Sequence, residues 1–144
     1  MLDEPIRNVM DGKKLLAATP DTPVHTVAAR MTRRKVSAVI VAEGKRLVGI
    51  FTERDAVSRV IAKGRDPRTT ALATVMTRNP ETVEPGETLG YALLKMHEHG
   101  FRHLPVVENG EPIGIVSARK ALDPDLEEFE AEAQRRRHIR RRAR

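Results

Sequence analysis

The segment from Gly49 to Asp55 carries the residue types of this 144-residue chain best suited to hold a small anionic ligand. It reads Gly-Ile-Phe-Thr-Glu-Arg-Asp, and Thr52 lies where an apolar run gives way to a polar, helix-forming stretch. Free backbone N–H groups at the beginning of a helix favour phosphate, and Arg54 adds a positive charge. Asp55, one turn later, is a two-oxygen acceptor suited to both hydroxyls of a ribose. The segment therefore predicts a nucleotide-binding motif, in which Gly49 allows the ligand to approach the backbone closely.

The same spacing has a purely structural interpretation. Thr-x-x-Asp is also a capping box, in which Thr52 and Asp55 satisfy each other's backbone N–H groups at a helix N-terminus. The residues alone favour this second interpretation.

The chain repeats the whole region around this motif. Residues 37–55 return as residues 102–120 at a constant offset of 65, so that Gly49 corresponds to Gly114 and Thr52 to Ser117. Val9-Met10 has an echo in Val75-Met76, one residue out of register. A unit this short cannot easily bury its own apolar face. We therefore expect the two copies to close on each other and to form a cleft between them.

Hydrophobic periodicity gives each repeat the order helix, strand, strand, helix. The predicted first helices carry apolar residues at i, i+3, i+4 and i+7, namely Val24, Val27, Ala28 and Met31, then Leu89, Ala92, Leu93 and Met96. Lys35 and Gly100 stand where these helices should end. The predicted strands are 38–42 and 47–51, then 104–107 and 113–116, and the second helices cover about 53–63 and 118 onwards. Residues 65–74 are predicted to be a polar linker.

Composition limits the classes of protein to which the chain could belong. There is no cysteine, which excludes disulfides, thiolate metal sites and cysteine nucleophiles. Apolar runs reach only five residues, far too few for a membrane span or a signal peptide, so we expect a cytoplasmic protein.

The net charge of +6 belongs to the C-terminal residues, because 1–134 carry 19 Lys and Arg against 20 Asp and Glu. Asp123 is a predicted helix N-cap, and the helix is expected to dock by its first turns and to fray beyond about Gln134. The arginines that follow are Arg135, Arg136, Arg137, Arg140, Arg141, Arg142 and Arg144. They predict salt-sensitive binding to nucleic acid, to an anionic membrane surface or to another acidic partner. The alternative is a solvated terminus without a ligand.

These motifs together resemble the cystathionine-β-synthase (CBS) domain family. The resemblance covers about residues 5–122 and rests on 49–55, 114–120, Val9-Met10, Val75-Met76-Thr77 and 101–107. It implies an α/β (α+β) fold of two β-α-β-β-α repeats, related by a pseudo-twofold axis and packed through their sheets. The implied domains are a first repeat with lead-in and linker over 1–74, a second repeat over 75–122, and a C-terminal acidic-to-basic helix and tail over 123–144.

The resemblance also implies a function. Tandem CBS pairs, or Bateman modules, are regulatory modules that commonly form homodimers and sense AMP, ADP, ATP, S-adenosylmethionine or dinucleotides. No obligatory cofactor and no enzymatic activity are implied. An interaction or nucleic-acid-tethering protein that acts through its arginine-rich tail remains the alternative.

Carried over residue by residue, the resemblance implies one ligand site shared by both repeats. Its residues are Gly49, Ile50, Thr52, Arg54 and Asp55 from the first repeat and Thr77, Phe101, Arg102 and His103 from the second. Phe101 would border an adenine, and Arg102 would donate two hydrogen bonds to phosphate. Arg102 and His103 have a plainer interpretation as a solvated strand edge.

A second, weaker site would combine Val36, Ser37, Ala38, Ser117 and Lys120. Lys120 stands where the ribose-binding aspartate belongs, and a cation cannot accept hydroxyl protons. We therefore expect nucleoside binding mainly at the Thr52 and Asp55 site. The histidines at 97, 99 and 103 match no zinc spacing, so no metal site is predicted.

Overall fold

In the computed structural model, the chain is described over residues 1–12, 15–119 and 132–138. The first repeat contains β1 (Ala17–Ala18), α1 (Val24–Arg34), β2 (Ala38–Glu43), β3 (Arg46–Thr52), α2 (Glu53–Asp55) and the π-helix η2 (Ala56–Ile61). The second contains α4 (Leu89–His99), β5 (His103–Glu108) and β6 (Glu111–Ser117). Three short elements lead into the repeats: the 3-10 helix η1 (Ile6–Asn8), α3 (Leu72–Val75) and β4 (Thr77–Arg78).

Each repeat is built on an antiparallel hairpin. β2 pairs with β3 and β5 pairs with β6, with one register shift in each hairpin at the same place, after Val41 and after Val106. A parallel segment flanks each hairpin: β1 runs beside β2, and Val83 bridges Val106. The predicted pair of β-α-β-β-α repeats is therefore confirmed through β6.

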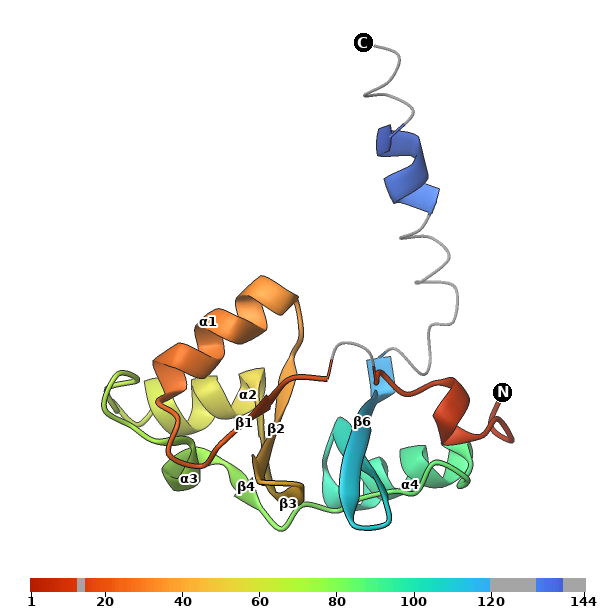
Figure 1. Cartoon of the computed structure of the whole chain (residues 1–144), viewed down its shortest axis with the longest axis horizontal. Coiled ribbons are helices and arrows are strands. Elements are labelled where there is room, and N and C mark those ends of the chain that lie inside the picture. The colour runs from red at the N-terminus through yellow and green to blue at the C-terminus, as the bar shows by residue number, and fades with distance from the viewer. Residues whose placement is uncertain (13–14, 120–131, 139–144) are drawn as a thin grey trace.

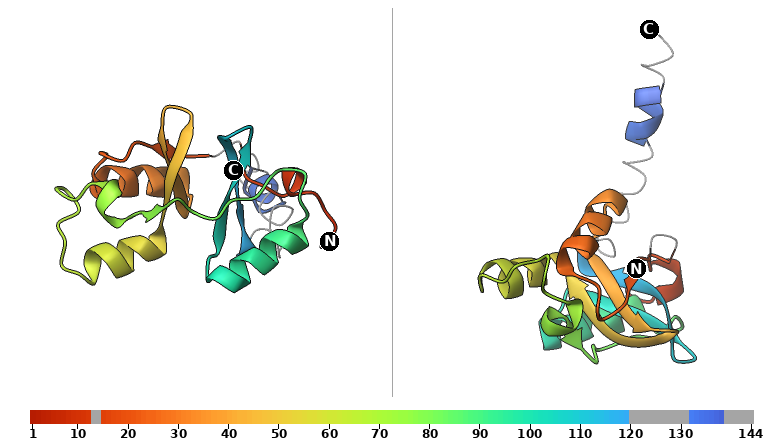
Figure 2. Two further views of the ribbon diagram at one scale, coloured as in Figure 1. Left: turned by 90° about the horizontal axis from the view of Figure 1, so that it is seen from below. Right: turned by 60° about the vertical axis from the view of Figure 1, so that its left-hand side comes forward.

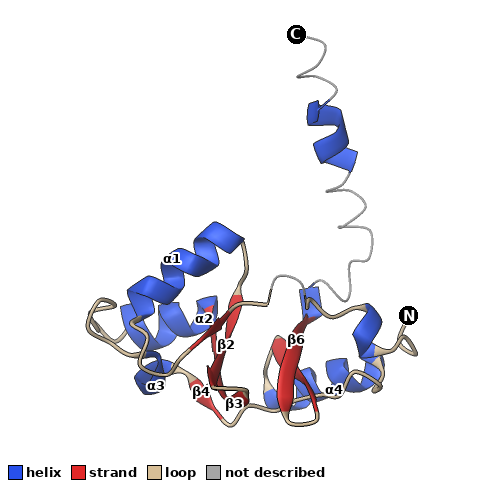
Figure 3. Cartoon of the chain, viewed as in Figure 1, coloured by secondary structure: helices blue, strands red, loops and turns tan. Residues whose placement is uncertain are grey.

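The two repeats lie side by side, with their strands toward the middle of the molecule and their helices outside (Figures 1 and 3). β3 and β6 are in contact across the boundary. An ion pair joins the hairpin turns there, with 3.9 Å between Lys45 Nζ and Glu111 Oε1.

The predicted first helices and their ends are confirmed. Val24, Val27 and Met31 of α1 are buried, as are Leu89, Ala92 and Met96 of α4. Lys35 and Gly100 both adopt the left-handed conformation that ends a helix, with φ of 56° and 73°.

The segments that lead into the repeats are exchanged between them. Ile6, near the beginning of the chain, is fully buried in the core of the second repeat. Leu72, Val75 and Met76 are buried in the core of the first. Each hydrophobic core therefore contains residues from the lead-in of the other repeat, which ties the two repeats together along the chain.

Two sequence predictions differ from the structure. The predicted polar linker 65–74 does not extend to its end, because α3 begins at Leu72, which is fully buried. The C-terminal segment is helical over residues 132–138, past the point where fraying was expected. The docking turns predicted from Asp123 lie outside the described residues, as do Arg140, Arg141, Arg142 and Arg144.

Across residues 1–12, 15–119 and 132–138, no helix combines the length and the apolar character needed to cross a membrane.

Candidate ligand-binding site

The junction between β3 and α2 forms a complete capping box. The Asp55 backbone N–H donates to Thr52 Oγ1 at 3.3 Å, and the Thr52 backbone N–H donates to Asp55 Oδ2 at 2.9 Å. Thr52 Oγ1 also donates to Asp55 Oδ2 at 3.1 Å. Thr-x-x-Asp therefore forms a helix capping box, as its structural interpretation predicted. A ligand at this place has to share Asp55 with the cap.

The second carboxylate oxygen of Asp55 faces a residue that the sequence analysis missed. Arg59 Nε lies 3.6 Å from Asp55 Oδ1, and the Asp55 side chain is only 13% exposed. The same guanidinium donates through Nη1 to the carbonyls of Val75 at 3.1 Å and Met76 at 3.0 Å. Arg59 therefore joins Asp55 to the segment that leads into the second repeat. Its spacing of four residues after Asp55 on a predicted helix was the available signal.

Gly49 allows close approach, as predicted, but the group that lies against it is the segment Met76–Thr77 of the protein and not a ligand. A Cβ atom at Gly49 would lie 2.6 Å from Met76 Sδ and 2.9 Å from the Thr77 carbonyl oxygen. Gly114 has the equivalent neighbours, Met10 Sδ at 2.9 Å and the Asp11 carbonyl at 3.1 Å. The space that the sequence analysis assigned to a ligand backbone contact is occupied by the exchanged lead-in segment.

A hydrogen bond crosses the boundary between the repeats beside the capping box. Ser37 Oγ lies 2.8 Å from His103 Nε2, and the contact is partly buried. Burial lowers the pKa of His103 below its ordinary value, while the negative charges of Glu53 and Asp55 act in the opposite direction. The carboxylates of α2 therefore lie near the first residue of β5, in the other repeat.

His103 also brings the two predicted sites together. It is paired in register with Ser117, just as Ala38 is paired with Thr52. Ser37 and Ser117, assigned from the sequence to the weaker site, therefore both lie at His103, assigned to the stronger one. The structure places them in one polar cluster at the repeat boundary.

The remaining predicted residues lie around this cluster in different environments. Thr77 is opposite Ile50 in the sheet, and Ile50 is buried. Phe101 packs against the core of the second repeat and stacks on His99, with ring centroids 6.3 Å apart. Val36 packs against the core of the first repeat.

The two predicted phosphate-binding arginines, Arg54 and Arg102, are exposed. Neither side chain forms a hydrogen bond or an ion pair with another described residue, so the structure does not join Arg102 to Asp55. Lys120 lies outside the described residues. Within the described part of the chain, no three His, Asp or Glu side chains converge in a way that would hold a metal ion.

The fold and this boundary define a class of protein, the tandem-repeat α/β module with a polar cluster between its halves. A family model for the CBS domain matches residues 6–62 and 72–124. The chain therefore belongs to the CBS domain family and carries two such domains.

Relatives and solved structures agree with this assignment. The chain is 40% identical over 122 residues to an Arabidopsis thaliana protein described as CBS domain-containing protein CBSCBSPB2. The match covers 84% of this chain and 23% of that relative, so the chain spans about a quarter of its length. An uncharacterized conserved protein from Pyrococcus horikoshii has a similar structure, with a TM-score of 0.79 and 31% identity over 87% of this chain and 94% of the other.

A further solved structure carries ligands. It is the CBS domain pair of a protein in complex with 5′-methylthioadenosine and S-adenosyl-L-methionine, with a TM-score of 0.74. The match covers 81% of this chain and 95% of that chain at 19% identity, so it shows a shared fold.

Proposed function

We propose that this CBS pair is a non-enzymatic regulatory module that binds an adenosine-containing ligand between its repeats. The observation that supports this most is the polar cluster at the boundary, where Ser37 bonds His103 and the Asp55 carboxylate lies nearby. Both repeats supply polar groups to it, so a ligand bound there would contact both. Such a ligand biases whichever relative orientation of the repeats it contacts better.

The capping box leaves Asp55 able to accept a ribose hydroxyl. Its Oδ2 accepts two hydrogen bonds from Thr52, but Oδ1 is 3.6 Å from Arg59, which is longer than a hydrogen bond. Oδ1 therefore has lone pairs that a hydroxyl group can use. Exposed Arg54 and Arg102 are available for the phosphate or another charged end of the ligand.

The experiment compares Asp55→Ala with a second cap variant by isothermal titration against AMP, ATP, S-adenosylmethionine and NAD. Asp55→Ala is expected to weaken binding about tenfold or more, because it removes a charged acceptor. Thr88→Ala removes a helix-capping side chain away from the proposed site, the N-cap hydroxyl of α4, where Thr88 Oγ1 accepts the Tyr91 N–H at 3.2 Å. This control should lose stability but not affinity. Undiminished binding by Asp55→Ala would contradict the proposal.

We further propose that the site containing Asp55 is the main nucleoside site and that Lys120 does not hold a ribose. Lys120→Ala is then expected to leave nucleoside affinity unchanged in the same titration. A loss of affinity as large as that of Asp55→Ala would reverse this assignment.

We also propose that the module acts as a homodimer in the cytoplasm. Large apolar side chains are exposed on both repeats, among them Ile61 at 72% and Leu94 at 54%. Their helices, η2 and α4, lie along the same side of the molecule (Figure 2, left). A second copy would cover this surface.

The alternative function is polyanion binding through the arginine-rich tail. Arg135 and Arg136 both contact Glu132, at 2.9 and 3.4 Å, so one carboxylate faces two guanidiniums. The exposed Arg137 adds to this positive surface. A gel-shift assay with double-stranded DNA at two salt concentrations, with and without residues 135–144, tests it. Salt-sensitive binding that is lost on truncation supports this function, and equal mobility of the DNA rejects it.

A further inference from the structure

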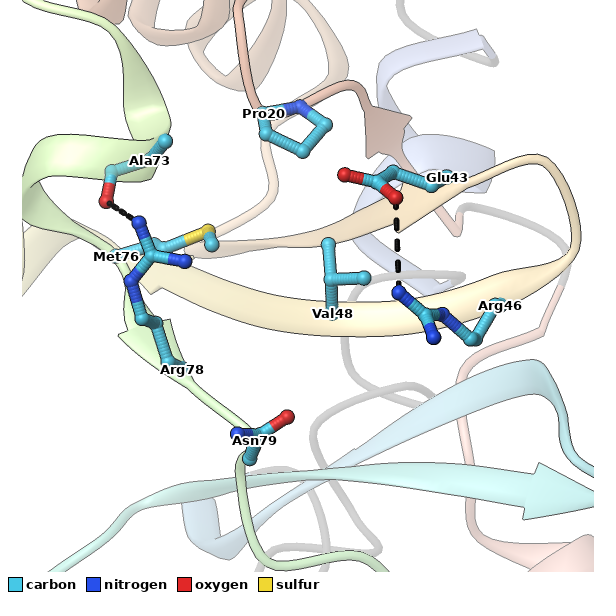
Figure 4. Close-up of a pocket in the computed structure, with 8 residues that line it drawn as sticks. All are labelled: Pro20, Glu43, Arg46, Val48, Ala73, Met76, Arg78 and Asn79. Atoms are coloured by element: carbon cyan, nitrogen blue, oxygen red, sulfur yellow. Dashed lines mark hydrogen bonds and ion pairs between the residues drawn. The ribbon is translucent and has the colours of Figure 1, made fainter.

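A pocket of about 380 Å³ lies in the first repeat, away from the repeat boundary cluster. It is formed by the turn end of the β2–β3 hairpin and by residues 73–79, which lead into the second repeat (Figure 4). Arg46, at the beginning of β3, lines it, whereas Thr52 ends that strand. Its volume falls within the range of ordinary small-molecule sites.

The pocket carries a guanidinium that no carboxylate of a described residue pairs with. Arg78 Nη2 donates to the carbonyl of Ala73 at 3.0 Å, and Arg78 forms no ion pair with any described residue. The main-chain carbonyl therefore fixes the orientation of this side chain without neutralising its charge. A fixed, uncompensated cation beside a cavity favours an anion.

A second guanidinium borders the same space. Arg46 Nη2 lies 3.6 Å from Glu43 Oε2, and the two side chains are 75% and 60% exposed. Exposed ion pairs at this distance contribute little to stability. The pocket lining thus contains two guanidiniums and one carboxylate, a net charge of +1.

Apart from the polar Asn79, the rest of the lining is apolar. Pro20, Val48 and the buried Met76 form this part, and Figure 4 shows Val48 between the two arginines. Apolar surface between two guanidiniums suits a ligand with an anionic group and a compact apolar body.

The two arginines are absent from the equivalent place in the second repeat. Arg46 pairs with Glu43 across its hairpin as Glu111 pairs with Glu108, so Glu111 corresponds to Arg46. Thr77 pairs with Ile50, and Asp11 pairs with Ile115, so Asp11 corresponds to Thr77. The next residue, Gly12, therefore corresponds to Arg78. The fold therefore forms without cations at these positions, and its architecture does not account for them.

From these observations we infer that the first-repeat pocket is a second ligand site, for a small organic anion bound by Arg46 and Arg78. The anionic group is a carboxylate or a phosphate monoester, and its apolar substituent packs on Val48 and Met76. This site is separate from the proposed adenosyl site and does not depend on it.

The test is an NMR titration of the full chain with benzoate and with phenyl phosphate, each compared with acetate or inorganic phosphate, which lack the ring. We expect saturable shifts of the Val48 and Asn79 amides with at least one ring-bearing anion, and weaker binding of its ring-free counterpart. The two ring-bearing probes distinguish a carboxylate ligand from a phosphate ligand.

Arg78→Gln and Arg46→Gln should each weaken binding about tenfold, since each removes a charged donor. Arg33→Gln removes the same charge from an exposed position on α1 and should bind as the wild type does. If Arg78→Gln does not fold, Arg46→Gln decides alone, because among the described residues the Arg46 side chain forms its ion pair with the exposed Glu43. The inference is overturned if neither ring-bearing anion gives saturable shifts at these amides, or if the folded variants bind like the wild type.

Discussion

Gly49 and Gly114 show how one residue type holds the two repeats together. Each lies against the methionine and the carbonyl of a lead-in segment that belongs, in sequence, to the other repeat. Because a side chain at either position would displace backbone, these glycines serve the exchange of segments between the repeats. Glycine recurs at the offset of 65 because each repeat makes the same contact with a lead-in methionine and carbonyl.

Gly49→Ala is expected to destabilise the protein by about 1–3 kcal/mol, because the new Cβ must displace Met76 and the Thr77 carbonyl. Chemical denaturation of the variant measures the loss. Gly86→Ala is the matched control, since a Cβ there would meet only the flexible end of Arg7 at 3.4 Å. Equal unfolding free energies for the two variants would contradict the packing described for Gly49.

His103 should make stability depend on pH in a defined direction. Burial lowers its pKa in the folded state, so the unfolded chain, with a histidine pKa near its ordinary value of 6.5, takes up the proton first. Stability is therefore fully present above about pH 6.5 and falls as the pH drops toward the folded-state pKa.

The measurement is the denaturation midpoint between about pH 7.5 and pH 5, for wild type, His103→Gln and His25→Gln. Glutamine is neutral at every pH used, so His103→Gln should remove the component of the acid-side loss that comes from this residue. The exposed His25 on α1 serves as the control. Identical profiles for His103→Gln and wild type would show that the histidine is not the source.

At the scale of elements, Arg59 supplies the side-chain hydrogen bonds that the structure describes between η2 and the lead-in of the second repeat, beside the apolar packing of Val60 on Leu72, Val75 and Met76. The Arg59 guanidinium bonds the carbonyls of Val75 and Met76, and β4 begins at the next residue, Thr77. A movement of η2 would therefore be transmitted to the strand β4, which pairs with β3. This places Arg59 between Asp55 and the connection of the two repeats.

Arg59→Ala should lower the unfolding free energy by about 1–3 kcal/mol, because two carbonyls lose a charged donor. It should also speed hydrogen exchange at the amides of Thr77 and Arg78, relative to Arg54→Ala. Arg54 is exposed and has no side-chain partner among the described residues, so it controls for the loss of charge. Unchanged exchange in Arg59→Ala would mean that the guanidinium does not hold this segment.

The exposed apolar faces of η2 and α4 should direct self-association. Ile61→Asp combined with Leu94→Asp is expected to convert a dimer to a monomer in analytical ultracentrifugation, because it places charges in the interface. Lys63→Asp, an exposed change beyond the end of η2, should leave the dimer intact. A wild-type chain that sediments as a monomer at all concentrations would refute the homodimer.

At the scale of the molecule, the sequence predicted the repeats because the same pattern occurs twice and the helical period is clear in both. It did not predict the exchanged lead-ins: the echo of Val9-Met10 in Val75-Met76 shows that the segments are equivalent, but not which core each enters. α3 was missed because four residues are too few to show a helical period. Periodicity reports local structure, whereas these features depend on the partner in space.

Only the part of the candidate site that depends on neighbouring residues in the sequence could be predicted. Thr52 and Asp55 are neighbours along the chain, so their mutual bonding could be read from their spacing. The bond between Ser37 and His103 joins residues 66 positions apart and assigned to two different sites. Only the packing of the repeats shows that these residues meet.

The most direct test of a ligand site shared by both repeats is an NMR titration with AMP, ATP, S-adenosylmethionine and NAD. It follows the amides of Thr52 and Asp55 in one repeat and of Arg102 and His103 in the other. With at least one of these compounds, all four amides should shift along a single binding isotherm. Shifts confined to one repeat, or no saturable shift with any of the four compounds, would contradict a shared site.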